Sequence, residues 1–291
     1  MKKISFFLCL SALLSTAFLQ EEMGMQISKS HTIDSLGACQ GASYQQGDLF
    51  LYGDREVGMI RRYRMAGDSL LYMGNEMKLT VGGKDVINHP TGLAVHGNLP
   101  VFIGNSIRLN PEGTLWKAMI YQVNWKGLQQ TGTLDHNLLH TIEDDTCVQG
   151  TRPEYVSYHG KWYVATADYG GKNNEVRLYD PARLTVANKT SEEKVLVKKF
   201  TCGPWVQNLQ WIPEKKWLLL IQNQVEGRKW RFTYVDLEQS IASGTARVMK
   251  VIDINERNDE LEGYTFLENL QKGIAVTSSR RNNVNTIRIN W

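Results

Sequence analysis

The sequence lacks a large net charge of either sign, any extended basic cluster and any apolar run long enough to cross a membrane. The formal net charge is +3, from 33 basic and 30 acidic residues that are interspersed along the chain. This pattern excludes the basic stripe by which proteins bind nucleic acid. Short clusters such as Arg61-Arg62 and Arg280-Arg281 are typical of solvated strands and loops. We therefore expect no nucleic-acid partner.

The single apolar run stands at the N terminus. Lys2 and Lys3 precede the stretch Ile4–Leu14, and Ser15-Thr16-Ala17 supplies the small residues of a cleavage site. The run is shorter than the ~20 residues of a membrane span and has the three parts of a secretory signal peptide. We predict a signal peptide at residues 1–20, one domain at residues 21–291, no membrane span, and a secreted or periplasmic protein.

A short strand, a polar turn and a second apolar strand recur five times. The clearest copies are Pro90–Gly97 and Pro153–Gly160, and weaker ones begin near Gln40, Gln207 and Glu262. Repeats of roughly 40 to 50 residues with four strands each are typical of propeller blades. The sequence therefore predicts an all-β fold, a five-bladed β-propeller, in which strands A to D of each blade run from the channel to the rim.

The last repeat is one strand short, because the chain ends after Gly263–Leu267, Gly273–Ser278 and Asn285–Asn290. The segment Met25–Ile33 alternates like a strand and precedes the first repeat. An open ring would leave unpaired strand edges, which are a liability. We predict that Met25–Ile33 pairs with Asn285–Asn290 and closes the propeller.

Three cysteines lie outside the N-terminal segment, each just before the first strand of a repeat: Cys39, Cys147 and Cys202. Cys147 and Cys202 precede neighbouring blades, and an oxidising compartment would permit a bridge between them. The alternative is a pair of buried free thiols.

Function in a propeller concentrates on the face where the D–A and B–C loops open. The candidate ligand-binding residues share that position, and they are Gln40, His89, Arg152, Asp168, Tyr169, Trp205 and Gln207. Trp205 could stack on a flat ligand or fill the funnel. His89 has no second histidine at metal-ligand spacing, which favours a structural use.

Glu154 and Glu262 are the carboxylates closest to the inner strands of blades 3 and 5. If they face each other across a pocket, they form a candidate catalytic pair of the kind that hydrolyses glycosides. Arg152 would oppose the protonated form that one of them needs. The alternative is that each glutamate pairs with a neighbouring blade.

A cation on the channel axis is a further hypothesis. Ca²⁺ prefers oxygen ligands, and four residues near the axis could supply them: Glu154, Asp168, Asn208 and Glu262. The chain has no aspartate-rich loop, so this hypothesis follows from the architecture.

The blade openings resemble those of known propellers. The run His89-Pro90-Thr91-Gly92-Leu93-Ala94-Val95 and the triplet Leu261-Glu262-Gly263 are similar to blade starts of NHL-type and gluconolactonase-like proteins. Those families usually have six blades. Five-bladed arabinanase-like and fructosidase-like glycosidases place an aspartate early in blade 1, whereas this chain has Cys39-Gln40-Gly41-Ala42-Ser43 there. Glu154 does match the position of their acid.

Two functions remain. We prefer a secreted module that binds a small polar or saccharide ligand in the central funnel, because no catalytic constellation stands out. The alternative is a carbohydrate or lactone hydrolase or lyase that uses Glu154 and Glu262, with or without Ca²⁺. An interaction scaffold would instead present an exposed apolar patch. Fold alone does not decide between them.

Overall fold

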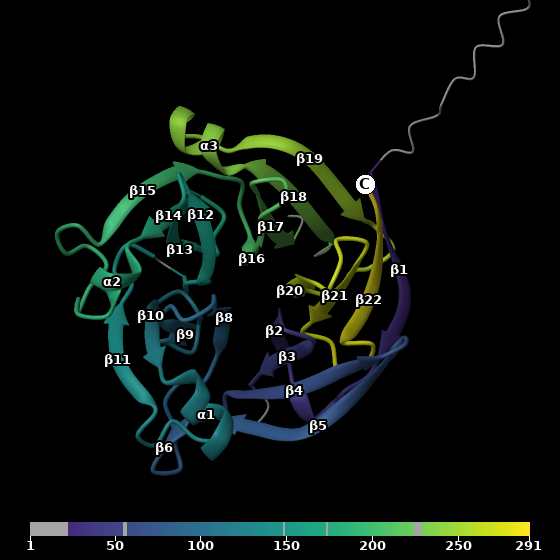
Figure 1. The fold of residues 1–291 in the computed structure, drawn as a ribbon, viewed down its shortest axis with the longest axis horizontal. Helices are drawn as coiled ribbons and strands as arrows, with labels where there is room; N and C mark the ends of the chain where they lie inside the picture. The colour runs from purple at the N-terminus through teal and green to yellow at the C-terminus, as the bar shows by residue number, and fades with distance from the viewer. Residues whose placement is uncertain (1–22, 55–56, 148, 173, 224–228) are drawn as a thin grey trace, which may run out of the picture.

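The computed structural model describes residues 23–54, 57–147, 149–172, 174–223 and 229–291. Within these ranges, five four-stranded antiparallel sheets stand around a common axis as the blades of a propeller (Figure 1). The predicted all-β class and the five blades are confirmed. The predicted signal peptide lies outside the described residues and stays a prediction. None of the helices in the described ranges has the length and apolarity of a membrane span.

Each blade runs from an inner strand A to an outer strand D. Blade 1 consists of β2 (Cys39–Gln45), β3 (Asp48–Gly53), β4 (Met59–Ala66) and β5 (Ser69–Lys78). Blade 2 consists of β8 (Pro90–Ala94), β9 (Val101–Arg108), β10 (Trp116–Val123) and β11 (Leu138–Glu143). A small hairpin, β6 (Thr80–Val81) with β7 (Lys84–Asp85), connects the two.

The other three blades follow the same order. Blade 3 consists of β12 (Glu154–Tyr158), β13 (Lys161–Ala167), β14 (Glu175–Tyr179) and β15 (Leu196–Thr201). Blade 4 consists of β16 (Val206–Ile212), β17 (Trp217–Asn223), β18 (Trp230–Asp236) and β19 (Arg247–Ile254). Blade 5 consists of β20 (Leu261–Phe266), β21 (Lys272–Thr277), β22 (Val284–Asn290) and the N-terminal β1 (Gly24–His31).

The first and last strands of the chain share one sheet. β1 pairs antiparallel with β22, from Gly24 opposite Asn290 to His31 opposite Val284. Met25 and Ile27 pack on the apolar cluster between blades 4 and 5. The predicted closure is therefore confirmed, and it removes the two open edges that the ring would otherwise expose.

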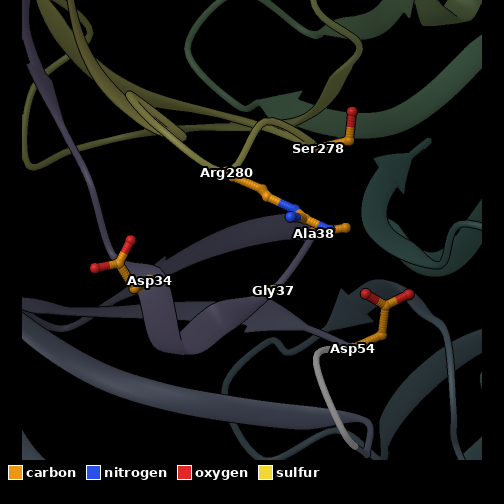
Figure 2. A pocket seen from close by; sticks show the side chains of 6 residues that line it. All are labelled: Asp34, Gly37, Ala38, Asp54, Ser278 and Arg280. Carbon is orange, nitrogen blue, oxygen red and sulfur yellow. The ribbon is translucent and has the colours of Figure 1, made fainter.

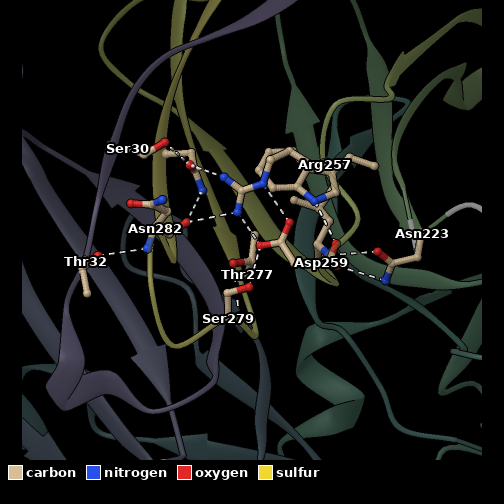
Figure 3. Close-up of polar contacts among 11 residues, drawn as sticks. Ser30, Thr32, Asn223, Arg257, Asp259, Thr277, Ser279 and Asn282 are labelled. Atoms are coloured by element: carbon tan, nitrogen blue, oxygen red, sulfur yellow. Dashed lines mark hydrogen bonds and ion pairs between the residues drawn. The ribbon is translucent and has the colours of Figure 1, made fainter. Parts of the chain in front are cut away.

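A cluster of polar side chains stabilises this closure at one end of blade 5 (Figure 3). Arg257 forms an ion pair with Asp259, donates to Asn285 Oδ1 at 3.2 Å, and lies over the Trp230 ring at 4.9 Å. Ser30 Oγ of β1 donates to the same Asn285 oxygen at 2.7 Å. Burial raises the pKa of Asp259, but hydrogen bonds from Arg257, Ser279 and Thr277 outweigh burial and hold it below its usual value.

Apolar side chains fill the space between neighbouring blades. Phe232 of blade 4 meets Tyr264 of blade 5 edge-on, with ring centroids 5.4 Å apart. Both rings are fully buried. Edge-to-face packing of this kind adds to the free energy of burial, so the inter-blade contacts hold the ring together.

Three short helices follow strand C of blades 2, 3 and 4: α1 (Trp125–Thr131), α2 (Pro181–Leu184) and α3 (Leu237–Ser243). Asn124, Asp180 and Asp236 cap them by accepting backbone N–H groups. A further short helix, η1 (Asp34–Leu36), precedes β2.

The cysteines are thiols in the structure. Cys39 and Cys147 are buried, Cys202 is partly buried, and all three are free. Cys147 Sγ accepts a hydrogen bond from Arg177 Nη1 at 3.2 Å. The structure thus has the free thiols of the alternative prediction, without the Cys147–Cys202 bridge.

Candidate functional site

A register shift recurs at one place in four of the five inner strands. The pairing of strands A and B skips one residue in blades 1, 2, 4 and 5, namely Gln40, Thr91, Gln207 and Glu262. Blade 3 has no shift between β12 and β13. Bulges of this type occur beside functional sites because they redirect a side chain. Three of the four skipped residues are candidates from the sequence.

Directly after the bulges, the inner strands approach each other at the axis. A Cβ on Gly263 would stand 2.6 Å from the Gly41 Cα, and one on Gly92 would stand 2.7 Å from Pro153. Only glycine permits this approach. Asn208, at the same level of blade 4, donates to the Tyr52 hydroxyl at 3.1 Å and to the Thr91 carbonyl at 3.4 Å. We call this level the waist of the channel.

The upper cavity lies above the waist, on the face where the D–A and B–C loops open. Its volume is about 250 Å³, and it is lined by His89, Ser106, Arg108, Trp116, Gln149, Arg152, Tyr169, Gln207, Glu260 and Glu262. These residues belong to blades 2 to 5 and their loops.

Arg152 is the centre of the polar network in the upper cavity. It is 3% exposed, and its Nε and Nη2 donate to the Gln207 carbonyl and Oε1 at 2.9 and 3.2 Å. Its guanidinium also lies 5.4 Å from the Tyr169 ring centroid. Burial lowers the pKa of Arg152, and the charges of Asp168 and Glu262 oppose that effect. A buried cation held in this way is fixed in orientation.

Glu260 connects the other side of the network. Its Oε1 accepts from Gln207 Nε2 at 2.9 Å and from the Tyr169 hydroxyl at 3.2 Å. Burial and then the charge of Glu260 raise the pKa of Tyr169, so this hydroxyl stays protonated as a donor. Arg152, Gln207, Glu260 and Tyr169 therefore form one hydrogen-bonded wall built from blades 3, 4 and 5.

Ser106 supplies the one lining hydroxyl that lacks a partner. Its residue is 4% exposed, and Oγ has no hydrogen-bond partner within the described ranges. An added Cβ on Gly150 would fall 1.7 Å from this oxygen, so the glycine leaves it room. A buried hydroxyl without a partner is costly, and a ligand in the cavity could supply one.

An outer basin of about 730 Å³ adjoins the upper cavity and is lined by Asp34, Gly37, Ala38, Asp54, Ser278 and Arg280. In Figure 2 the Arg280 side chain extends toward Ala38, and Asp54 stands at the end of β3. The Asp54 carboxylate lies 2.7 Å from His89 Nδ1. This contact joins the basin of blades 5 and 1 to the upper cavity.

Glu154 does not share the upper cavity with Glu262. It lines a second space of about 260 Å³, the lower cavity, together with residues of the A–B turns such as Gln45 and His96. Burial raises the pKa of Glu154 to about 8, although its carboxylate accepts the Trp211 backbone N–H. The two glutamates predicted to face each other thus belong to separate cavities, which have no lining residue in common.

The four oxygen donors considered for Ca²⁺ do not fit a shared site. Glu154 and Glu262 line different cavities, and Asn208 Oδ1 accepts the Leu209 backbone N–H at 2.8 Å. Asp168 Oδ1 accepts the Gln149 backbone N–H at 2.8 Å. No group of three or more histidines, cysteines and acids able to hold a metal occurs in the part of the chain that the structure describes.

Five of the predicted site residues line the upper cavity: His89, Arg152, Tyr169, Gln207 and Glu262. Gln40 and Asp168 are buried and do not line it. Trp205 does not line it either, but packs edge-on against Tyr169, with ring centroids 5.2 Å apart. Ligand binding by these residues remains a prediction.

Sequence reasoning missed Ser106, Arg108 and Trp116. These residues belong to one hairpin, in which β9 continues to Arg108 and β10 begins at Trp116. The turn residues Asn110-Pro111-Glu112-Gly113 between the two strands were the available signal. The Arg108 guanidinium lies over the Trp116 ring, 5.0 Å from its centroid.

No protein-family model and no curated protein matches the chain. Among solved structures, it is similar to the GH43_1 enzyme from Xanthomonas citri complexed with xylose (9% identity, TM-score 0.50, 91% of this chain and 90% of that chain). It is also similar to Kuenenia stuttgartiensis hydrazine synthase, with 14% identity and a TM-score of 0.44 over 87% of this chain. A putative 6-phosphogluconolactonase from Bacteroides fragilis has 13% identity and a TM-score of 0.39 over 82% of this chain. The chain spans 59% and 63% of the length of the latter two. At 9% identity, the likeness to the Xanthomonas citri enzyme concerns the fold alone.

Proposed function

We propose that this protein is a secreted or periplasmic binding module that holds one small polar or saccharide ligand in the upper cavity. The observation that carries this proposal is the fixed polar wall of Arg152, Gln207, Glu260 and Tyr169, which faces the partnerless hydroxyl of Ser106. Ligand sites combine a concave surface with a few oriented polar groups in this way.

The size and charge of the upper cavity limit the ligand. Its volume of about 250 Å³ is slightly below the ~300 Å³ at which drug-sized pockets begin. The lining carries charges of both signs, from Arg108 and Arg152 and from Glu260 and Glu262. A small molecule with several hydroxyl or carboxyl groups meets both donors and acceptors there.

A hydrolase or lyase that uses Glu154 and Glu262 has less support. Such chemistry requires two carboxylates at one bond, roughly 5 to 10 Å apart. The two glutamates line separate cavities, so this pair does not meet the requirement.

The test is a thermal-shift screen with pentoses, hexoses, uronic acids and lactones, followed by calorimetry on the compounds that stabilise the protein. A ligand at 100 times its Kd should raise the free energy of unfolding by about 2.7 kcal/mol. Ser106→Ala should lower the affinity for that ligand about 3- to 10-fold, because one hydrogen bond is lost. Ser69→Ala, at an exposed position of β5, is the matched control.

Two results would overturn the proposal. One is a screen in which no compound stabilises the protein. The other is the formation of a product when the protein is incubated with a stabilising sugar or lactone, because turnover would show that the protein is an enzyme and not a binding module.

A further inference from the structure

The lower cavity lies on the channel axis below the waist, at the face where the A–B turns meet. All five blades contribute to its volume of about 260 Å³. Its polar and aromatic lining comprises Ser43, Tyr44, Gln45, His96, Glu154, Tyr155, Trp162, Gln210, Trp211 and Thr265. None of these residues lines the upper cavity.

We propose that the lower cavity is a second binding site, which takes one uncharged, hydroxyl-bearing ring, a neutral saccharide unit or a cyclic polyol. Glu154 and the Trp211 indole N–H are the groups that hold it. This site is separate from the proposed function of the upper cavity, and the waist of Gly41, Gly263 and Asn208 stands between the two.

The first argument is an unused donor. Trp211 is 6% exposed, and its Nε1 has no hydrogen-bond partner among the described residues. An indole N–H donates and cannot accept, and tryptophans that are buried usually find an acceptor. The missing partner is therefore an oxygen, and the cavity that Trp211 lines is where a ligand could bring it.

The second argument is the absence of charge. Among the residues that the structure describes, no lysine or arginine lines the lower cavity, and the titratable side chains that do are Glu154, His96, Tyr44 and Tyr155. Burial raises the pKa of Glu154 to about 8 and lowers that of His96. Burial, followed by Glu268, raises the pKa of Tyr44 to about 12. All four groups are thus neutral at pH 7, so neither an anion nor a cation finds a counter-charge.

The third argument is the shape of the walls. The Tyr155 hydroxyl is used in a hydrogen bond to the Pro100 carbonyl at 2.6 Å, so this residue offers its ring rather than its oxygen. His96 stacks on Trp162 with centroids 3.6 Å apart, which holds the Trp162 ring in place. A ligand ring with an apolar face and with hydroxyl groups at its edge fits such a pocket. A hydroxyl can accept from Trp211 and also donate to Glu154.

The experiment follows the indole N–H signals in ¹H–¹⁵N spectra of the intact protein. Eight tryptophans give a countable set, and Trp211→Phe identifies the Trp211 signal by its loss. The probes are glucose, xylose, arabinose and myo-inositol, with glucuronate and glucosamine as charged counterparts of similar size. Ser69→Ala, at an exposed position of β5 outside both cavities, is the control, and circular dichroism verifies that each variant is folded.

We expect at least one neutral probe to move the Trp211 signal, and the charged probes to leave it in place. Calorimetry should show about 3- to 10-fold weaker binding for Trp211→Phe and unchanged binding for Ser69→Ala. Affinity should fall as the pH rises above 8 in the natural protein and stay constant in Glu154→Gln.

Several outcomes would overturn the proposal. A Trp211 signal that no neutral probe moves would do so, as would an equal shift of that signal with glucuronate. Equally weak binding in Ser69→Ala would show that the loss in Trp211→Phe is not specific to the lower cavity. Unchanged affinity in Trp211→Phe would remove the indole donor from the site. Failure of the upper cavity to bind any compound leaves these readouts intact, so the two proposals fail separately.

Discussion

Glu154→Gln should stabilise the protein at alkaline pH and leave its stability at pH 5 nearly unchanged. The carboxyl group of Glu154 has a pKa of about 8 in the folded protein, against its ordinary value of 4.5, because burial disfavours the anion. Between these two values the folded state binds a proton that the unfolded state has lost. The free energy of unfolding therefore falls as the pH rises from 4.5 to 8, and remains lower above pH 8.

The size of the effect follows from the same pKa difference. At 1.36 kcal/mol per pKa unit, the shift from 4.5 to about 8 amounts to about 5 kcal/mol for a fully enclosed carboxyl. Glu154 is only partly buried and borders the lower cavity, so water reduces the penalty. We expect a loss of roughly 3 to 5 kcal/mol at pH 8.5. The glutamine keeps an oxygen for the Trp211 backbone N–H and carries no charge at any pH.

Urea unfolding followed by tryptophan fluorescence at pH 5, 6, 7, 8 and 8.5 measures this difference. Other groups with shifted pKa values, including His96 and Asp259, contribute equally to both proteins and cancel. Glu193→Gln is the control, because the Glu193 side chain is 85% exposed. A difference between Glu154→Gln and the natural protein that stays constant from pH 5 to 8.5 would refute the reasoning.

Four further outcomes are expected. Arg257→Ala should lower the free energy of unfolding by about 2 to 3 kcal/mol in urea titrations, because Asp259 and Asn285 lose their partner. Asp259→Asn should cost stability at neutral pH, and that cost should shrink as the pH falls through the lowered pKa of Asp259. Gly263→Ala should destabilise by about 2 kcal/mol or more, since its methyl meets the Gly41 Cα at 2.6 Å. Gly170→Ala meets only Asn174 at 3.8 Å and should match the natural protein. N-terminal sequencing of the exported chain should begin between residues 18 and 21, and a start at Met1 contradicts the signal peptide.

The strand order was predictable because it depends on local patterns. Runs of β-branched and aromatic residues between turn signals mark strands such as β3, β12 and β16 in the sequence. The closure by β1 followed from a count of strands and the cost of an open edge. Neither inference required knowledge of side-chain contacts.

The candidate site was less predictable because it depends on register. A bulge inserts one residue, and a shift of one residue turns a side chain to the other side of a strand. Nothing in the runs Cys39-Gln40-Gly41 and Pro153-Glu154 indicates that the first has a bulge and the second does not. The placement of Glu154 and Glu262 in two different cavities could therefore not be predicted from the sequence.

The same difference in register explains why the axis carries two cavities. In blades 1, 2 and 5 the residue after the bulge is a glycine: Gly41, Gly92 and Gly263. Without side chains at this level, the inner strands come close enough for Asn208 to reach both Tyr52 and Thr91 and close the channel. Blade 3 has no bulge and places Glu154 at its first pair with β13. Because the waist above it is closed, Glu154 faces the A–B turns, where burial keeps it protonated.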